Sequence, residues 1–449
     1  MRIGSGAGFG ADRLDPALRL IEQGRLDWIG FECLAERTLA QAQTARAADP
    51  AKGYNRYLEA RLRACLPAMA KNGTRLITNM GAANPAAAAR AAASLCGSGG
   101  PSVAYVEGDD VRHLIDDTTP LADTGGTVAD IGTPVISANA YLGTPVISAN
   151  AYLGIEQILP AIDSGAAIII TGRVADPSLF LAPLAHRYGW ALDDWARLGA
   201  GTLIGHLLEC AAQVTGGYFA DPGYKDVPGV EDVGFPLAEV AADATAIITK
   251  LDSDGGLVDA RTVKEQVLYE VHDPARYLTP DVTADFSGVA LRAEGRNRVG
   301  LSGASGTARP ETLKVTVAFD GGLIAEAGIS YAGPGAADRG RLAADILRHR
   351  LRDIAELRVD LIGVAALHAS AESVRRNAPS GSADVRVHVT ARTDDADTAD
   401  RVLWEVEALY TCGPAGGGGV RGVVRRSFTT HDAYIPRDAI SIRTEVIRP

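Results

Sequence analysis

Several predicted strand ends in the first half of the chain finish in glycine together with an amide, a carboxylate or an arginine. Glu32 ends the second predicted strand, Asn79 the third, and Asn150 closes a later one. Arg173 and Asp176 follow the last strand of the series. Ligands of α/β sheets bind outside the carboxyl ends of the strands, so we expect these five side chains to form one catalytic site. The alternative is that the strand ends simply run into polar loops.

Arg173 and Asp176 carry the chemistry of this predicted site. An arginine after a buried strand can bind a carboxylate or phosphate through two hydrogen bonds, and Asp176 can orient it or act as a base. Asn79 and Asn150 would stabilise an enolate-like oxygen. A structural ion pair, with Asp176 capping the helix from Pro177, remains the alternative.

A glycine-rich turn follows the first strand and supplies candidate binding positions. Gly6 and Gly8 lie in a GxGxxA match, and with Glu32 further on this resembles a dinucleotide fingerprint. The helix is expected to begin only near Pro16, too late to direct its N-terminus at a phosphate beside Gly8. The sequence therefore favours a turn that binds another anion, or none, over NAD(P) binding.

Two later segments add further binding candidates. Gly81 and Asn84 follow the third strand. Near the C-terminus, Gly416 and Gly417 begin a run of glycines whose backbone N–H groups could form an anion nest beside Arg421. A flexible linker is the alternative for this second segment.

The histidines give weaker signals. His206, with Glu209 and Cys210, borders an apolar helical stripe, which favours a hydrogen-bonded core histidine over a metal ligand or general base. His272 lies at a charged helix end, where a solvated or interdomain face is favoured and an acid/base role stays open. No GxSxG, HExxH or Walker A pattern is present, so no metal site is expected and any cofactor is unknown.

The elements that position these residues change along the chain. Residues 1–232 alternate apolar runs with helical patterns, which predicts a Rossmann-like α/β domain with a parallel sheet. Residues 233–330 form a β-rich segment that we expect to pack on it. Residues 331–449, with a strand near Gly328–Tyr331, follow the order βαββαβ of a ferredoxin-like α+β domain.

An 11-residue sequence, GTPVISANAYL, occurs at Gly132–Leu142 and again at Gly143–Leu153. An odd shift along a strand would reverse which face is buried. We therefore expect one copy to form the native strand and the other to bulge out as a loop. The second copy leads directly into the helix at Ile155, which favours it as the native one.

Composition limits the partners. The net charge of the 449-residue chain is −11, which argues against binding to nucleic acid or anionic membranes. No apolar stretch approaches the ~20 residues that span a bilayer. Five scattered cysteines fit reduced thiols in a cytoplasmic protein. A small anionic substrate, a carboxylate or an acyl-CoA, remains compatible with a locally positive site, and the oligomeric state, including a homo-oligomer, stays open.

Many long runs resemble one family across nearly the whole chain, among them FECLAERTLA, TNMGAANP, ITGRVADPSLFLAPL, TGGYFADPGYKDVP and GPAGGGGVR. They are similar to the acyclic terpene utilisation (AtuA) family. The resemblance implies a bacterial catabolic protein of citronellol- and geraniol-type terpene degradation, with acyl-CoA intermediates, an N-terminal α/β region and a ferredoxin-like C-terminal domain. It supplies no mechanism. Where the family has one copy of the repeated segment, this chain has two, so Asn139 or Asn150 holds the family position.

Three functions remain compatible with the sequence. The first is a lyase or hydratase acting on a branched carboxylic acid or acyl-CoA, which needs an anion clamp and an acid/base pair. The second is an NAD(P)-dependent oxidoreductase, suggested by the Gly6–Ala11 pattern. The third is a non-catalytic subunit or scaffold of a catabolic complex, suggested by the lack of a strong catalytic motif.

Overall fold

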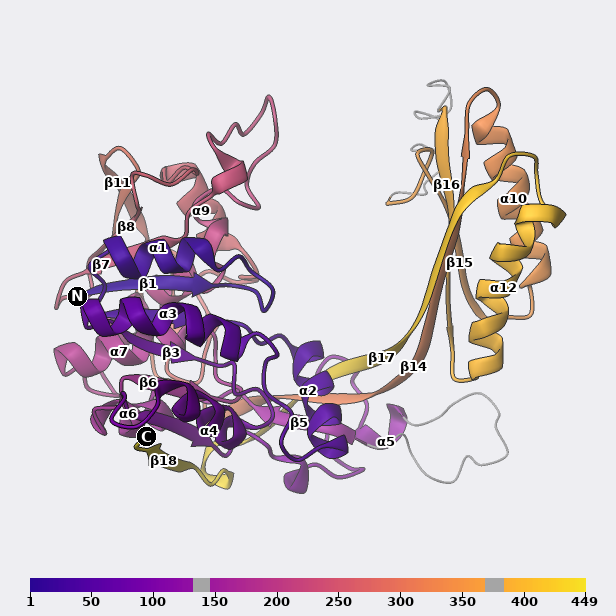
Figure 1. Cartoon of the computed structure of the whole chain (residues 1–449). Coiled ribbons are helices and arrows are strands. Elements are labelled where there is room, and N and C mark those ends of the chain that lie inside the picture. The colour runs from indigo at the N-terminus through magenta and orange to yellow at the C-terminus, as the bar shows by residue number, and fades with distance from the viewer. Residues whose placement is uncertain (132–145, 368–382) are drawn as a thin grey trace. The chain divides into compact units, whose positions relative to one another are not determined.

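The computed structural model describes residues 1–131, 146–367 and 383–449 (Figure 1). The chain divides into two compact units. Unit 1 comprises Met1–Ala318 and Thr430–Pro449, and unit 2 comprises Phe319–Thr429. The predicted segments 1–232 and 233–330 thus lie mainly in unit 1, to which the last 20 residues of the predicted 331–449 domain also belong. Whether those three segments fold as separate domains stays a prediction.

A run of parallel strands forms the centre of unit 1, as the alternation of strands and helices predicts. In spatial order these strands are β1 (Arg2–Ala7), β2 (Trp28–Phe31), β3 (Arg75–Thr78), β6 (Ile168–Thr171) and β4 (Val103–Glu107). Each pairs in parallel with its neighbour. Their carboxyl ends therefore lie at one edge of the sheet.

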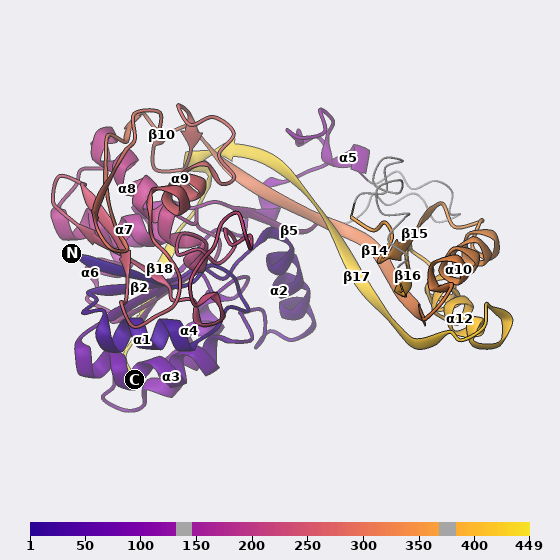
Figure 2. The ribbon, with the colours of Figure 1, turned by 90° about the horizontal axis from the view of Figure 1, so that it is seen from above.

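Helices cover both faces of the parallel strands. Figure 2 shows α1 (Asp15–Gln23), α3 (Leu58–Asn72) and α4 (Pro85–Cys96) on one side, where they bury their apolar stripes against β2. On the other side, Gly30 of β2 leaves room for Phe180, because a Cβ on Gly30 would lie 2.6 Å from that ring. The other helices of unit 1 are α2 (Glu36–Ala48), α5 (Val128–Ile131), α6 (Ile155–Asp163), α7 (Ser178–Tyr188), α8 (Trp195–Glu209) and α9 (Ala260–Leu268).

Antiparallel strands extend this sheet on both sides, so the sheet is mixed and has ten strands. The added strands are β7 (Pro236–Val240), β8 (Ala246–Lys250), β12 (Arg298–Ser302) and β11 (Ala290–Gly295) beside β1, and β18 (Arg443–Ile447) beside β4. The predicted β-rich segment therefore continues the same sheet. A separate three-stranded sheet contains β9 (Tyr277–Leu278), β10 (Thr283–Asp285) and β13 (Ser305–Thr307).

Unit 2 contains an antiparallel sheet in the predicted βαββαβ order. Its elements are β14 (Thr312–Ala332, which begins in unit 1), α10 (Ala336–Arg350), β15 (Glu356–Ile362), β16 (Asp384–Thr393), α12 (Ala396–Cys412) and β17 (Gly418–Pro436). The strands are ordered β15-β16-β14-β17. Leu347 of α10 and Val406 of α12 belong to the core that these helices form with the sheet. Among the described helices of the chain, none is long and apolar enough to cross a membrane.

The strand predicted near Gly328–Tyr331 is the end of a longer strand, the 21-residue β14. Within β14, Gly322 takes a φ of +72° and its N–H donates to Asp320 Oδ1 at 3.1 Å. This local irregularity is accommodated within the strand without ending it.

The second copy of the repeated segment forms strand β5 (Val146–Ala151), as the sequence favours. β5 does not join the ten-stranded sheet but pairs with β14. Leu153 continues into a bridge with Val174, just beyond β6. The expectation that the first copy, Gly132–Leu142, bulges out as a loop falls outside the described residues.

Candidate functional site

The carboxyl-terminal edge of the parallel strands gathers charged and amide side chains. Glu32 follows β2, Asn79 follows β3, Asp109 lies just beyond β4, and Arg173 just beyond β6. All four side chains are buried. Because these strands are neighbours in the sheet, the structure brings together residues from four distant parts of the chain.

Asn79 holds Glu32 in place. Its Nδ2 donates to Glu32 Oε1 at 2.9 Å, and its Oδ1 accepts from the backbone N–H of Cys33 at 2.8 Å. The N–H of Leu34 also donates to Glu32 Oε1 at 2.8 Å. Burial raises the pKa of Glu32 well above its ordinary value, and the charge of Asp176 raises it further. Both ends of the Asn79 amide are therefore engaged inside the protein.

Arg173 joins two carboxyl groups through different parts of the residue. Its backbone N–H donates to Asp109 Oδ2 at 2.9 Å, and its Nη2 donates to Asp176 Oδ1 at 2.7 Å. Nη1 donates to the carbonyl of Leu34, and the guanidinium lies 4.1 Å from the centre of the Tyr152 ring. Only 2% of the side chain is exposed. The predicted anion clamp is thus occupied by internal partners.

Asp176 is the accessible member of this group. A third of its side chain, 33%, is exposed, although its carboxyl lies among other charged groups. Burial raises its pKa to about 6, Arg173 opposes the increase, and Glu36 adds to it. Glu36 itself accepts a hydrogen bond from the Tyr152 hydroxyl, and the Lys314 ammonium lies 5.2 Å from the Tyr152 ring centre. A carboxyl with a pKa near 6 can take up and release a proton near neutral pH.

Asp109 forms the second such carboxyl. Its Oδ2 accepts from Asn150 Nδ2 at 2.8 Å as well as from the backbone of Arg173. Burial raises its pKa to about 6, and these two hydrogen bonds oppose the increase. Asn150 Oδ1 is buried and has no hydrogen-bond partner among the described residues. Asn150 therefore uses one amide N–H on Asp109 and presents its oxygen as an acceptor.

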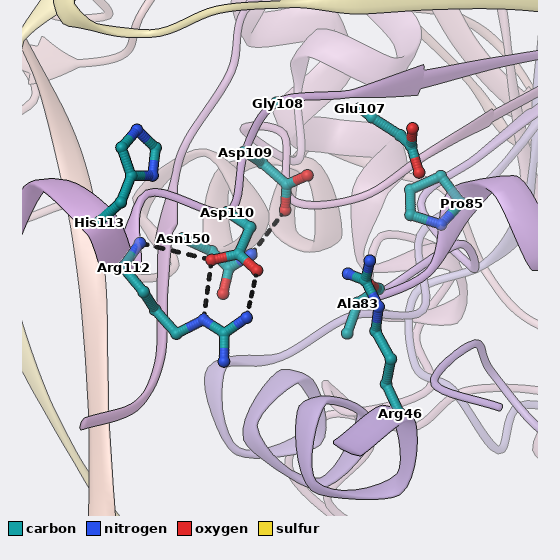
Figure 3. A pocket seen from close by; sticks show the side chains of 10 residues that line it. All are labelled: Arg46, Ala83, Pro85, Glu107, Gly108, Asp109, Asp110, Arg112, His113 and Asn150. Atoms are coloured by element: carbon teal, nitrogen blue, oxygen red, sulfur yellow. Dashed lines mark hydrogen bonds and ion pairs between the residues drawn. The ribbon is translucent and has the colours of Figure 1, made fainter. Parts of the chain in front are cut away.

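Asp109 and Asn150 line an open pocket of about 580 Å³ (Figure 3). The remaining lining residues are Arg46, Ala83, Pro85, Glu107, Gly108, Asp110, Arg112 and His113. Figure 3 shows Arg112 paired with Asp110, through bonds of 2.9 and 2.8 Å, while Arg46 donates to the carbonyl of Ala83 at 2.6 Å. Two guanidinium groups and an imidazole therefore share the pocket with the carboxyl groups of Glu107, Asp109 and Asp110.

The glycines predicted to bind substrate in unit 1 permit close packing. A Cβ would lie 2.5 Å from the Phe31 ring at Gly6, 2.4 Å from the backbone of Cys210 at Gly8, and 2.4 Å from the Thr171 carbonyl at Gly81. Asn84 caps α4 through the N–H of Ala87, and its Nδ2 donates to two loop carbonyls. These contacts explain the residue types without a ligand, and a binding role for them stays a prediction.

The C-terminal glycines lie in unit 2. Gly416 has a φ of +74°, and a Cβ on Gly417 would lie 2.9 Å from Ile329. Arg421 is exposed and donates to the carbonyl of its neighbour Val420. The structure therefore places Gly416, Gly417 and Arg421 within unit 2, and the anion nest stays a prediction.

Sequence reasoning did not select Asp109 for the site. Its position directly after a strand was the available signal. Tyr152 and Lys314 were missed, and Lys314 could not have been found, because it comes from β14, far along the chain.

His206 is buried with both ring nitrogens hydrogen-bonded, and His272 is exposed, as the sequence favours for each. Within the described ranges no group of three or more His, Cys, Asp or Glu residues is arranged to hold a metal ion.

Comparison with known proteins gives one match. The family model described as "Acyclic terpene utilisation family protein AtuA" matches residues 1–446. No curated protein and no solved structure matches the chain.

Proposed function

The chain belongs to the acyclic terpene utilisation (AtuA) family, and from this premise we propose that it is a catabolic lyase or hydratase. Its substrate is a branched carboxylic acid or acyl-CoA intermediate of acyclic terpene breakdown. The observation that carries the proposal is the pair Asp109 and Asp176, two carboxyls whose pKa values lie at about 6 and which share Arg173 as a partner.

This pair suits reactions that move protons next to a carbonyl group. A lyase or hydratase removes a proton at one atom and returns one at another, and a group with a pKa close to the working pH serves best in both steps. Asp109 lies on the pocket and acts on the substrate there. Asp176, with its exposed third, is the second proton-transferring group. Arg173 positions both carboxyls.

Other residues around the pocket and the strand ends take supporting roles in this proposal. Arg46 and Arg112 at the pocket rim bind the substrate carboxylate or a CoA phosphate. Asn150 orients Asp109 through its Nδ2, rather than stabilising an oxyanion. Asn79 and Glu32 fix the neighbouring strand end, with Glu32 as a further buried acid.

Finer assignments of fold and location follow the same premise. The parallel strands with helices on both faces favour a Rossmann-like centre for unit 1. The strand order β15-β16-β14-β17 favours a ferredoxin-like unit 2. A net charge of −11 favours a small-molecule substrate over nucleic acid, and we place the protein in the cytoplasm.

The test is turnover by the purified protein of branched, unsaturated acids of the citronellol and geraniol type and their CoA thioesters. Mass spectrometry detects addition of water or cleavage. Asp109→Asn, Asp176→Asn and Arg173→Ala are compared with Glu22→Gln, an exposed carboxyl on α1. Unchanged turnover in all three site variants would eliminate this site. A reaction that requires NAD(P)H would instead support the alternative that the protein is an oxidoreductase. Activity that appears only when a partner protein is added would support the alternative that it is a non-catalytic subunit.

A further inference from the structure

A second proton-carrying pair is buried on helix α8. His206 and Glu209 lie one turn apart, with 1% and 9% of their side chains exposed. His206 Nδ1 is 2.8 Å from Glu209 Oε1, and His206 Nε2 is 2.8 Å from the backbone carbonyl of Gln266 on α9. The Gln266 side chain donates in turn to the carbonyl of His206 at 3.2 Å, which fixes the ring between the two helices.

These contacts determine how many protons the pair holds. A backbone carbonyl only accepts hydrogen bonds, so His206 Nε2 must carry a hydrogen. The contact between Nδ1 and Glu209 Oε1 then needs one more proton, because two bare acceptors would repel each other at 2.8 Å. That proton lies either on the ring, which makes an ion pair, or on the carboxyl, which makes a neutral pair.

The surroundings favour the neutral pair. Burying two charges costs more than burying two hydrogen-bonded neutral groups. Burial lowers the pKa of His206 to about 4 and raises the pKa of Glu209 well above its ordinary value. Asp176, Glu270 and Arg173 are the charged groups that act on Glu209, and the two carboxylates among them further disfavour a negative charge on it. The rings of Tyr277 and Phe286 flank His206, with centres 5.5 and 6.0 Å away.

The His206–Glu209 pair also lies close to the segment that contains Asp176 and Pro177. Gly205, next to His206, packs on Pro177, next to Asp176, so that a Cβ on Gly205 would lie 2.5 Å from the Pro177 carbonyl. At the end of α8, Gly8 packs equally closely on the backbone of Glu209 and Cys210. Glu209 Oε2 is buried and has no hydrogen-bond partner among the described residues. One carboxyl oxygen is therefore committed to His206, and the other is left for a further group.

We propose that Glu209 is a neutral carboxylic acid that shares its proton with His206 and is a further acid/base residue of the Asp176 site. This inference rests on the proposed function. A substrate O–H or acidic C–H gives its proton to Oε2, while the proton on Oε1 passes to His206 Nδ1. Glu209 stays neutral, His206 becomes an imidazolium, and the substrate keeps the electron pair as an anion. The new negative charge on the substrate offsets the cost of the buried imidazolium, and the reverse transfer returns the proton. His206 is the positioning residue and proton store.

NMR of the ¹⁵N-labelled histidine rings in the full-length protein, without substrate, measures the first part of the proposal. His206 is assigned by comparison with His206→Gln. The expected result is a neutral ring that carries its hydrogen on Nε2 at pH 7. A doubly protonated His206 at this pH would make Glu209 an anion and overturn the proposal.

Glu209→Gln tests the second part. The glutamine amide can still donate to His206 Nδ1, so the fold should be retained, but it cannot exchange a proton. We expect turnover of the substrate identified above to fall at least ~100-fold, with little change in KM and with an altered pH profile. Glu22→Gln is the matched control. A Glu209→Gln enzyme with the rate and pH profile of the parent would overturn the proposal, whereas a lack of any lyase or hydratase activity in the parent protein would refute the proposed function on which this role rests.

Discussion

Asp109 and Asp176 bind opposite ends of the same residue, and burial raises the pKa of each to about 6. Among the described residues, Asp109 accepts from two neutral donors, the backbone N–H of Arg173 and the amide of Asn150. Asp176 is paired with the Arg173 guanidinium itself. Only 4% of Asp109 is exposed, against 33% of the Asp176 side chain. Both carboxyls therefore reach a pKa of about 6, but neutral donors oppose the increase at Asp109 and the Arg173 cation opposes it at Asp176.

This difference shows how one arginine can serve two carboxyls without making them equivalent. The backbone N–H of Arg173 survives any side-chain substitution, so Asp109 keeps that donor. The guanidinium does not survive, so Asp176 depends on the side chain. Substitutions of the Arg173 side chain should therefore change the pKa of Asp176 more than the pKa of Asp109.

The largest expected effect is that of Arg173→Ala. It removes a buried guanidinium, leaves Asp176 without its cation and removes the stacking on Tyr152, so we expect a loss of about 3–5 kcal/mol in the free energy of unfolding. Urea denaturation measures it. Arg112→Ala, which breaks an exposed pair with Asp110, should cost at most about 1 kcal/mol. Equal losses in the two variants would show that Arg173 is not the organising residue of the site.

Asp109→Asn and Asp176→Asn should each lower turnover by about 10²- to 10⁴-fold, because the amide keeps the shape but cannot transfer a proton. In the parent enzyme, the rate should change with a midpoint near pH 6. Removing either carboxyl should change the shape of the pH profile, because only the other one then titrates near pH 6. Steady-state kinetics from pH 4 to 9 provides the measurement, and a profile identical to the parent's in either variant would exclude that carboxyl from proton transfer.

Stability should respond to pH in the same window. Asp109 binds its proton more tightly in the folded protein, with a pKa of about 6, than in the unfolded chain, with a value of ~3.9. Its contribution therefore favours the folded state at low pH and is lost as the pH rises through about 6, by roughly 2–3 kcal/mol in total. Asp109→Asn should remove this part of the slope in urea titrations between pH 4 and 7. An unchanged slope would contradict the pKa assigned to Asp109.

The smallest effect is expected from the repeated segment. Asn150→Ala removes one of the two donors to Asp109 and should cost about 1–2 kcal/mol. Asn139→Ala, the equivalent change in the first copy, should cost almost nothing if the second copy holds the family position. Thermal melts compare the two.

Deleting Gly132–Leu142 should leave the protein soluble and slightly more stable, by about 0.6 kcal/mol for each halving of the connection. The melting temperature and solubility of this deletion variant check the result. Aggregation, or a melting temperature lower by several degrees, would show that the first copy is structural.

Local patterns made much of the site predictable. Glu32, Asn79 and Arg173 each follow an apolar run that forms a parallel strand, and the rule that ligands bind at carboxyl ends brings them together. The pattern could not show how their hydrogen-bonding groups are used. The guanidinium of Arg173 and the amide of Asn79 bind internal partners, because burial leaves no polar group free of a partner without cost.

The rest of the fold could not be predicted, because it depends on pairing between strands that are far apart in the sequence. The β-rich segment gave no sign that β7 would pair with β1, because an antiparallel strand can add to either sheet edge with the same local pattern. The contact of Lys314 with the Tyr152 ring also depends on long-range pairing, because it requires β14 to pair with β5. The sequence placed a strand near Gly328–Tyr331 but did not show its length, because the pairing of β14 with β16 from Leu323 to Ala332 joins segments about 60 residues apart.

The most direct test of the two-carboxyl site is a ¹³C NMR titration of the aspartate side chains, with Asp109 and Asp176 assigned from their asparagine variants. Both should titrate near pH 6 in the parent protein. In Arg173→Lys, which keeps the backbone donor and a cation but loses the planar guanidinium, Asp176 should shift upward while Asp109 stays near 6. Midpoints near the usual ~3.9 for both groups would contradict the account.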